Sequence, residues 1–507
     1  MEPQSGQATV LTGGALWNGA GFERADLAVV RGRIAAILPP GGAGEGGAAI
    51  VDARGCAILP PFFDGHVHSS STLLRGTENS YPLELWSFWA IGYGRGATAA
   101  SIRASLRLTA IEMIRAGIGG YVDHFPPARF VEDGLAVHRE SGLRIGFAPF
   151  FADLVDEDLL DMPLDRSVIA AVAPMTRTDP EDLRRRTAIL AAMADDRITP
   201  LLGPNAPQRC SPELLSLWAR LADEHGLGSH THLLETYPQS LAAAARWAGG
   251  AVGELDRLGL LDGRTSLAHA IWLDGPARRL LARREATAIH NPLSNQMLGS
   301  GRMPVRAMLD DGVRLGLGTD CSNTSGRHDL FEAMRQMLVS GRDAGSRHDR
   351  WIRPDEVLRA AVEDGWAALG KGPARLIAGA PADLMVLDFR TASLAAAEIS
   401  AASIVSHGDS GAVRDLMIAG RWLMRDRAIR VFDEAEIIDE AAGHAAALRE
   451  AARPLLQRLH PQIGDYDRWS AGVFSGLACP HCGGVGGRHG FRAEPAEVPD
   501  AAKIADQ

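Results

Sequence analysis

The chain has 507 residues, of which 46% are hydrophobic and 22% charged, and it carries a formal net charge of -10. The composition is ordinary for a soluble globular protein, and the length predicts one large domain together with smaller ones. The negative charge argues against a nucleic-acid partner, because nucleic-acid binders usually present a basic face.

Targeting signals and a disulfide framework are not evident. The first residues show neither a basic start nor a long apolar run, and no segment is apolar enough to span a bilayer, so we expect a cytoplasmic protein without membrane contact. Five cysteines, three of them scattered (Cys56, Cys210 and Cys321), fit a reducing compartment.

Lysine is almost absent. Lys371 and Lys503 are the only two in the sequence, so a mechanism that needs a lysine within the first 370 residues is excluded. The chain has no Gly-Lys-Ser/Thr loop of the kind that cradles phosphates, and a Schiff-base lysine is disfavoured.

Short strands joined by tight turns are predicted near the N-terminus, as in a small antiparallel sheet. They cover residues 8–11, 26–30, 33–37 and 50–52.

From Ile58 onward, short apolar runs alternate with amphipathic helical segments, as in a buried parallel sheet. The apolar runs are 58–63, 118–123, 143–151, 198–203, 228–232, 265–269, 287–290 and 313–319. Helices are predicted at 99–116, 180–196, 212–225 and 330–342. Eight strands with crossover helices predict an α/β fold, a (β/α)8 barrel.

Strand patterns return at 382–388 and 413–420, and we expect these strands to pair with the N-terminal ones. The predicted domains are a composite β-sheet domain (1–58 and 372–432), a barrel (59–371) and a C-terminal part (433–507). The C-terminal part is expected to hold a helix to about His460 and then a loosely structured tail.

Two histidines stand one residue apart at the exit of the first barrel run. On a strand, residues i and i+2 point to the same side, so the imidazoles of His66 and His68 can reach one point. The first two ligands of a divalent metal must reach one point in this way. His-x-His pairs also arise by chance on strand edges.

Further metal-ligating and acidic residues fall at or just after the ends of later runs, where a barrel carries its catalytic groups. They are His230, His232, Glu235, His269, His290 and Asp320.

Five motifs in order carry a family resemblance: His66-Val67-His68, His232-Leu233-Leu234-Glu235-Thr236, Leu267-Ala268-His269, His290-Asn291-Pro292-Leu293-Ser294-Asn295 and Gly318-Thr319-Asp320. Over residues 8–432 the chain resembles the amidohydrolase superfamily. Within it, the chain is most similar to the branch of S-adenosylhomocysteine, guanine and 8-oxoguanine deaminases and triazine hydrolases.

The resemblance implies that His66, His68, His232 and Asp320 bind one divalent ion, zinc or iron. Many superfamily members bridge two metals with a carbamylated lysine, and the missing lysine excludes that arrangement here. The resemblance also implies a homodimer.

The implied reaction is hydrolytic deamination of an aminated nitrogen heterocycle of purine, pterin, pyrimidine or triazine type, with release of ammonia after attack by metal-bound hydroxide. Asp320 would take a proton from the water, Glu235 would protonate a ring nitrogen, and His269 would stabilise the hydroxyl of the intermediate. The alternatives are hydrolysis of another ring substituent, chloride or alkylamine, and a barrel that has lost catalysis and acts as a binding protein.

Several residues are expected to contact the small-molecule substrate: Trp86, His124, Asn205, Gln208, Ser294 and Asn295. Asn205 stands where relatives commonly have a substrate-contacting histidine, which leaves the substrate open. His124 is equally compatible with a satisfied core histidine.

Other polar residues receive structural interpretations. His230 and His290 are expected to be buried supporting residues, and His328 to lie in a solvated loop. Cys479 and Cys482 have the spacing of half a zinc knuckle, and a flexible tail is the preferred reading.

Overall fold

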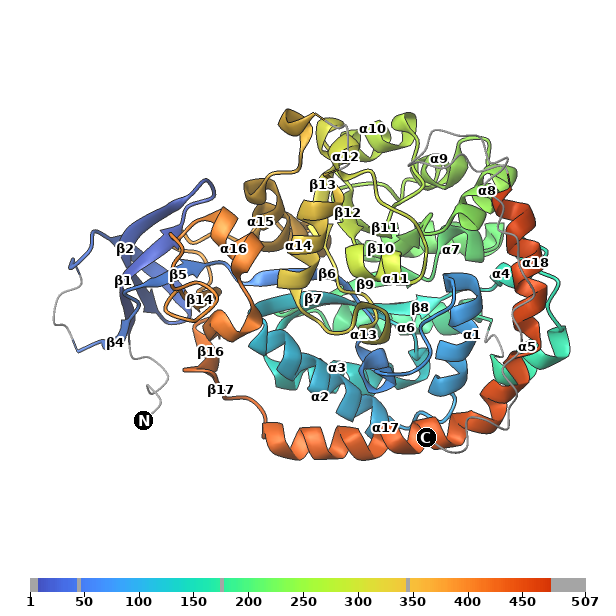
Figure 1. The fold of residues 1–507 in the computed structure, drawn as a ribbon, viewed down its shortest axis with the longest axis horizontal. Coiled ribbons are helices and arrows are strands. Elements are labelled where there is room, and N and C mark those ends of the chain that lie inside the picture. The colour runs from blue at the N-terminus through green and yellow to red at the C-terminus, as the bar shows by residue number, and fades with distance from the viewer. Residues whose placement is uncertain (1–7, 43–46, 174–176, 343–346, 476–507) are drawn as a thin grey trace.

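The computed structural model describes residues 8–42, 47–173, 177–342 and 347–475. Eight parallel strands close into a barrel, and a nine-stranded mixed sheet lies beside it (Figure 1). This confirms the predicted α/β fold, including the sheet built from both ends of the chain. Cys479 and Cys482 lie outside the described residues.

The barrel strands alternate with helices along the chain. The strands are β6 (Phe62–Val67), β7 (Ile118–Phe125), β8 (Arg144–Phe151), β9 (Ile198–Pro204), β10 (Gly228–Leu233), β11 (Thr265–His269), β12 (Thr287–His290) and β13 (Arg314–Leu317). The helices up to β13 are α1 (Leu83–Gly94), α2 (Ala99–Arg115), α3 (Val131–Ser141), α4 (Asp156–Leu159), α5 (Arg166–Val172), α6 (Pro180–Ala192), α7 (Pro212–His225), α8 (Tyr237–Arg246), α9 (Gly250–Arg257), α10 (Gly275–Arg283), α11 (Pro292–Met297) and α12 (Val305–Asp310). They are followed by α13 (Ser322–Ser325), α14 (Leu330–Ser340), α15 (Pro354–Val362) and α16 (Ala401–His407).

Local sequence explains where α7 begins and ends. The Ser211 side chain accepts a hydrogen bond from the Leu214 amide, and Pro212 occupies the first turn, where no amide hydrogen is needed. Gly226 ends the helix in a left-handed conformation that glycine adopts without steric cost.

The mixed sheet joins the two ends of the chain. Its N-terminal strands are β1 (Thr9–Trp17), β2 (Phe22–Val30), β3 (Arg33–Leu38), β4 (Ala49–Asp52) and β5 (Cys56–Leu59), and its C-terminal strands are β14 (Leu384–Asp388), β15 (Val413–Ile418), β16 (Arg421–Arg425) and β17 (Ala428–Ile429). The two groups meet where β14 pairs antiparallel with β5, with Met385 opposite Leu59.

The predicted single strand over residues 58–63 is wrong. The segment divides into β5, which belongs to the mixed sheet, and β6, which belongs to the barrel. Pro60 and Pro61 separate them, and since proline has no amide hydrogen to donate to a ladder, the chain changes sheets there.

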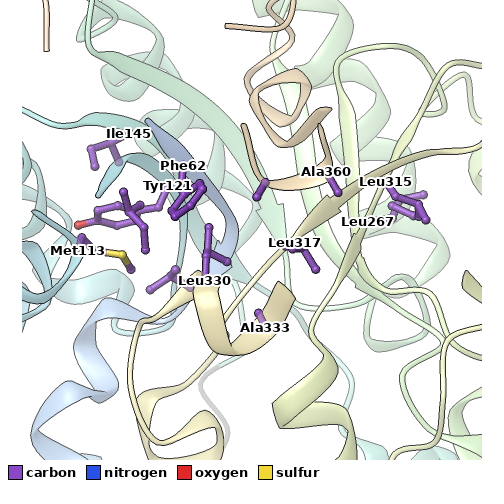
Figure 2. Close-up of a cluster of buried hydrophobic side chains, with 14 of the residues drawn as sticks. Phe62, Met113, Tyr121, Ile145, Leu267, Leu315, Leu317, Leu330, Ala333 and Ala360 are labelled. Carbon is purple, nitrogen blue, oxygen red and sulfur yellow. The ribbon is translucent and has the colours of Figure 1, made fainter. Parts of the chain in front are cut away.

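The main core lies between the barrel strands and the surrounding helices. Figure 2 shows Phe62 and Tyr121 from neighbouring strands packing against Met113 of α2 and Leu330 of α14. A six-residue 3-10 helix (Asp364–Leu369) fills the barrel at the N-terminal ends of its strands, where the ring of Trp366 lies 4.7 Å from that of Phe63.

Residues 462–474, predicted to begin a loosely structured tail, are helical. Helix α17 (Glu434–Leu456) is followed by α18 (Gln462–Phe474), and both run along the outside of the barrel (Figure 1). Residues 462–474 are helical because Tyr466 is buried and the indole of Trp469 donates a hydrogen bond to the carbonyl of Leu160 at 3.2 Å. None of the helices in the described ranges combines the length and apolar character that a membrane crossing requires.

Candidate active site

A cavity of about 1200 Å³ opens at the C-terminal ends of the barrel strands. Its wall includes His68, His232, Glu235, His269 and Asp320, each of which lies at the end of a strand or in the loop after it. The fold therefore gathers the polar residues that were predicted from four separate strand ends.

Three imidazoles and one carboxylate face a common point. Nε2 of His66 and Nε2 of His68 lie 3.5 and 3.4 Å from Oδ1 of Asp320, and Nε2 of His232 lies 3.2 Å from Nε2 of His68. Nitrogen and oxygen donors at these separations can ligate one divalent ion. Nε2 of His66 is buried and has no hydrogen-bond partner among the described residues, as expected for a donor atom that serves a metal.

The outer ring nitrogens orient these imidazoles. Nδ1 of His68 donates to the carbonyl of His124, and Nδ1 of His232 donates to the carbonyl of Asn205 at 2.6 Å. Nδ1 of His66 lies 2.7 Å from Nε2 of His230, whose own Nδ1 lies 2.7 Å from Oγ of Ser266. Such contacts fix the tautomer so that each Nε2 turns its lone pair to the site. His230 is buried, as expected, and lies directly behind His66.

Electrostatics favours metal binding. Burial lowers the pKa of His66 to about 3 and holds the pKa of His232 well below its usual range, so both imidazoles are neutral at pH 7. Burial by itself raises the pKa of Asp320, but the neighbouring imidazoles of His66, His269 and His68 together outweigh burial and hold that pKa well below the usual range. Neutral imidazoles beside an ionised carboxylate are the protonation states that metal binding requires.

Glu235 has the opposite character. Burial, followed by the nearby charges of Asp320 and Glu84, raises its pKa well above the usual range. Ser300 donates to its Oε1 at 3.2 Å, and its Oε2 lies 3.5 Å from Nε2 of His269. Two neighbouring carboxyl groups whose pKa values are shifted in opposite directions suit an acid and a base.

His269 and Asp320 are held in unusual backbone conformations. Their φ angles are 69° and 63°, in a region that residues other than glycine rarely adopt. Nδ1 of His269 lies 2.7 Å from Oδ1 of Asn295, and Ser294 donates to Oδ2 of Asp320 at 2.7 Å. Strained residues persist where their surroundings overdetermine them, which is common at functional sites.

The residues predicted to contact substrate divide into three groups. Trp86 and Asn205 line the cavity, and the indole nitrogen of Trp86 has no partner among the described residues. Ser294 and Asn295 contact Asp320 and His269 directly. The remaining two, Gln208 and His124, are buried and are not among the described residues that line the cavity.

Two further predictions concern histidines near the site. His290 is buried, as expected. The prediction that His328 lies in a solvated loop is wrong: the side chain is fully buried, with Nδ1 2.7 Å from Oγ1 of Thr319 and Nε2 3.4 Å from Oγ1 of Thr72. The surrounding Ser, Gly and Arg residues resemble a loop, but the hydroxyl partners Thr319 and Thr72 lie 9 and 256 positions away in the sequence.

Glu84 was not anticipated from the sequence. It lies in the first turn of α1, is 3% exposed, and lines the cavity. Thr236 donates to its Oε1 at 2.5 Å, and Tyr466 of α18 donates to its Oε2 at 3.1 Å. No local signal could have found this residue, because Tyr466 is 382 positions away.

Comparison with known proteins agrees with this geometry. Residues 57–423 match the model of the amidohydrolase family, and the chain belongs to that family. It is 31% identical over 439 residues to a 5-methylthioadenosine/S-adenosylhomocysteine deaminase of Haloarcula marismortui, covering 85% of this chain and 95% of the relative. It is 28% identical over 417 residues to a 5'-deoxyadenosine deaminase of Methanosarcina mazei, covering 82% and 90%.

The fold is shared with a crystal structure of an adenosine deaminase from Xanthomonas campestris with bound zinc. The TM-score is 0.78 at 23% sequence identity, and the match covers 88% of this chain and all of that chain.

Proposed function

We propose that this chain is a metal-dependent deaminase that replaces the 6-amino group of an adenine nucleoside with oxygen and releases ammonia. The observation that carries the proposal is the position of Glu235, whose pKa is raised, beside the imidazole cluster and Asp320, whose pKa is lowered, in one cavity. The deaminases to which the chain is similar act, by their names, on 5'-deoxyadenosine, 5-methylthioadenosine and S-adenosylhomocysteine.

His66, His68, His232 and Asp320 would hold the ion, and zinc suits this nitrogen-rich donor set. When bound, the ion supplies a water molecule whose pKa is lowered from 15.7 to about 7. The buried and unpartnered Nε2 of His66 supports the assignment.

The residues of the chain then move the protons. Asp320 accepts a proton from the attacking water as the oxygen bonds to the ring carbon, and Glu235 donates its proton to the adjacent ring nitrogen. His269, whose Nδ1 faces Asn295, offers the lone pair of Nε2 to the new hydroxyl group. As the carbon–nitrogen bond breaks, Asp320 gives its proton to the departing amine, and the hydroxyl proton returns to Glu235.

Buried, unpaired cysteines support a further part of the proposal, a cytoplasmic location. Cys56, Cys210 and Cys321 are buried free thiols, in keeping with a reducing cytoplasm. We expect a homodimer, which light scattering of the purified protein tests directly.

The proposed reaction is tested with purified, zinc-loaded protein. Ammonia release is measured with 5'-deoxyadenosine, 5-methylthioadenosine, S-adenosylhomocysteine, guanine and a chlorotriazine. We expect kcat/KM of about 10⁴ M⁻¹s⁻¹ or more for at least one adenine nucleoside. Chloride release from the triazine without ammonia release from any nucleoside would favour the substituent hydrolase, and the absence of turnover with every compound would overturn the assignment.

A further inference from the structure

Arg209 is a largely buried cation in the wall of the cavity, and the proposed reaction has no use for it. It ends the short 3-10 helix Pro207–Arg209 that follows β9, and 21% of its side chain is exposed. Its Nε donates to Oδ1 of Asp156 at 2.8 Å, and its Nη2 donates to Oδ2 of the same carboxylate. This two-point pair balances the charge of Arg209 and fixes the plane of its guanidinium group.

The remaining nitrogen of the guanidinium group contacts the side chain of Asn205. Nη1 of Arg209 lies 2.6 Å from Oδ1 of Asn205. A guanidinium group has only donors, so the atom that it contacts must be the amide oxygen and not the amide nitrogen. The side chain of Asn205 is thereby oriented, with its oxygen bound to Arg209 and its NH2 group on the other side.

The backbone polar atoms of Asn205 are occupied as well. Its amide donates to the carbonyl of Phe151 at 2.9 Å, and its carbonyl accepts from Nδ1 of His232 at 2.6 Å. Within the part of the chain that the structure describes, the side-chain nitrogen of Asn205 makes no hydrogen bond. Because Asn205 is half-buried and lines the cavity, this nitrogen is a donor that the cavity offers to its ligand.

Two simpler roles for Arg209 explain less. An anionic substrate group bound to Arg209 would lie next to the carboxylate of Asp156, which already neutralises the guanidinium group. A purely structural ion pair would act on stability alone, and it leaves the contact to Asn205 without a purpose.

We propose that Arg209 is a positioning residue that orients Asn205, so that the NH2 group of Asn205 donates a hydrogen bond to the nucleoside. The inference rests on the proposed function and adds a specificity contact to the same site. The partner atom is an acceptor that carries a lone pair, either ring nitrogen N3 or N7 of the purine or a hydroxyl oxygen of the sugar. A substrate without that acceptor is disfavoured, since it covers the donor and leaves it without a partner.

Asn205→Asp tests the orientation of the amide. Aspartate has the same shape and keeps an oxygen on Arg209, but it presents an acceptor to the cavity in place of a donor. Kinetics are measured with the adenine nucleoside that the unaltered chain deaminates best. We expect KM to rise about tenfold or more with kcat much less affected, because the lost contact belongs to binding, and the melting temperature to be retained. An unchanged KM would overturn the proposal.

Arg209→Lys separates positioning from stability. Lysine keeps the charge beside Asp156 but cannot hold the carboxylate at two points and the amide oxygen of Asn205 at once. Arg144→Lys is the matched control, because Arg144 lies outside the cavity, donates to both oxygens of Asp383, and donates through Nη1 to the carbonyl of Asp196 at 2.8 Å.

We expect both lysine variants to lower the melting temperature and only Arg209→Lys to raise KM, by about three- to tenfold. If Arg209→Lys lowers the melting temperature and leaves KM unchanged, as Arg144→Lys should, Arg209 is a structural residue and the proposal is wrong.

Substrate analogues identify the acceptor. The compounds 3-deazaadenosine, 7-deazaadenosine, 2'-deoxyadenosine and 3'-deoxyadenosine each lack one candidate atom, and kcat/KM of each is compared with that of adenosine. The comparison is made in the unaltered chain and in Asn205→Ala, which has no donor to lose, so that intrinsic differences in reactivity cancel. For one analogue we expect a penalty about tenfold larger in the unaltered chain.

Equal penalties in the two chains for all four analogues would overturn the proposal. Failure of the unaltered, zinc-loaded chain to deaminate any adenine nucleoside would instead contradict the proposed function.

Discussion

The two ends of the eight-stranded barrel bury different kinds of side chain, apolar at one end and polar at the other. At the N-terminal ends, the 3-10 helix 364–369 inserts Trp366 and Leu369 among apolar side chains such as Phe63 and Ile289, and the indole nitrogen of Trp366 donates to the carbonyl of Pro61 at 3.3 Å. At the C-terminal ends, buried imidazoles of His66, His124 and His269 have ring nitrogens without partners.

The difference shows how stability and function are separated along one barrel. The closed end is the one at the N-terminal ends of the strands. Filling it with apolar groups removes apolar surface from water without leaving polar atoms unpaired. The open end, at the C-terminal ends of the strands, carries buried ring nitrogens without partners. These nitrogens are costly in the isolated chain and useful only when an ion and a substrate bind to them. Substitutions at the closed end should therefore act on stability, and those at the open end on metal binding and turnover.

The largest expected effect is on turnover. Glu235→Gln keeps the shape of the side chain but removes the acidic proton, and general acid catalysis is worth about 10²–10⁴-fold. We expect kcat to fall by that factor while zinc content and melting temperature stay unchanged. Steady-state kinetics of the metal-loaded variant checks this, and near-normal turnover would remove Glu235 from the mechanism.

Trp366→Ala tests the closed end. The side chain is 4% exposed, and truncation of a buried tryptophan costs about 3–5 kcal/mol. We expect a large fall in the melting temperature, with kcat retained well below it. Trp422→Ala, at a half-buried position of the mixed sheet, is the control and should lower the melting temperature much less. Equal effects would mean that the 3-10 helix does not seal the barrel.

Asp364 makes the closed end sensitive to pH. Burial raises its pKa from 3.8 to about 6, so the folded chain binds the proton more tightly than the unfolded chain. Stability should therefore decline as pH rises from about 4 to 6, by roughly 3 kcal/mol for this group. Melting temperatures across that range should decline less steeply for Asp364→Asn, whereas Asp223→Asn at an exposed site should follow the unaltered chain. Parallel curves for all three would contradict the assignment.

The smallest expected effect concerns the support of His269. Asn295→Ala removes the partner of its Nδ1, and loss of such supporting contacts typically costs 10–100-fold in activity. We expect that fall in kcat with zinc affinity unchanged, since His269 is not an expected ligand. Asn205→Ala leaves the contact to His269 intact and serves as a comparison that should change KM more than kcat. A loss of zinc from Asn295→Ala would instead place His269 on the ion.

Much of the barrel could be predicted because its signals are local. Runs of apolar residues separated by amphipathic helices reveal buried parallel strands, and His66 and His68 share a side of the chain by the geometry of an extended segment. The prediction failed at residues 58–63, because an apolar run does not show which sheet each half will join. It failed again at His328, because burial depends on partners that approach from elsewhere.

The sequence by itself determined the fold class, the absence of a lysine for a bridged metal pair, and the order of the strand-end residues that mark the family. Only the tertiary structure decided that Tyr466 supports Glu84 at the cavity, that Trp366 closes the far end, and that Asp156 holds Arg209 beside Asn205. The physical reason is that spacing along a strand or helix is set by local backbone geometry, whereas contacts between distant segments depend on how the completed elements pack.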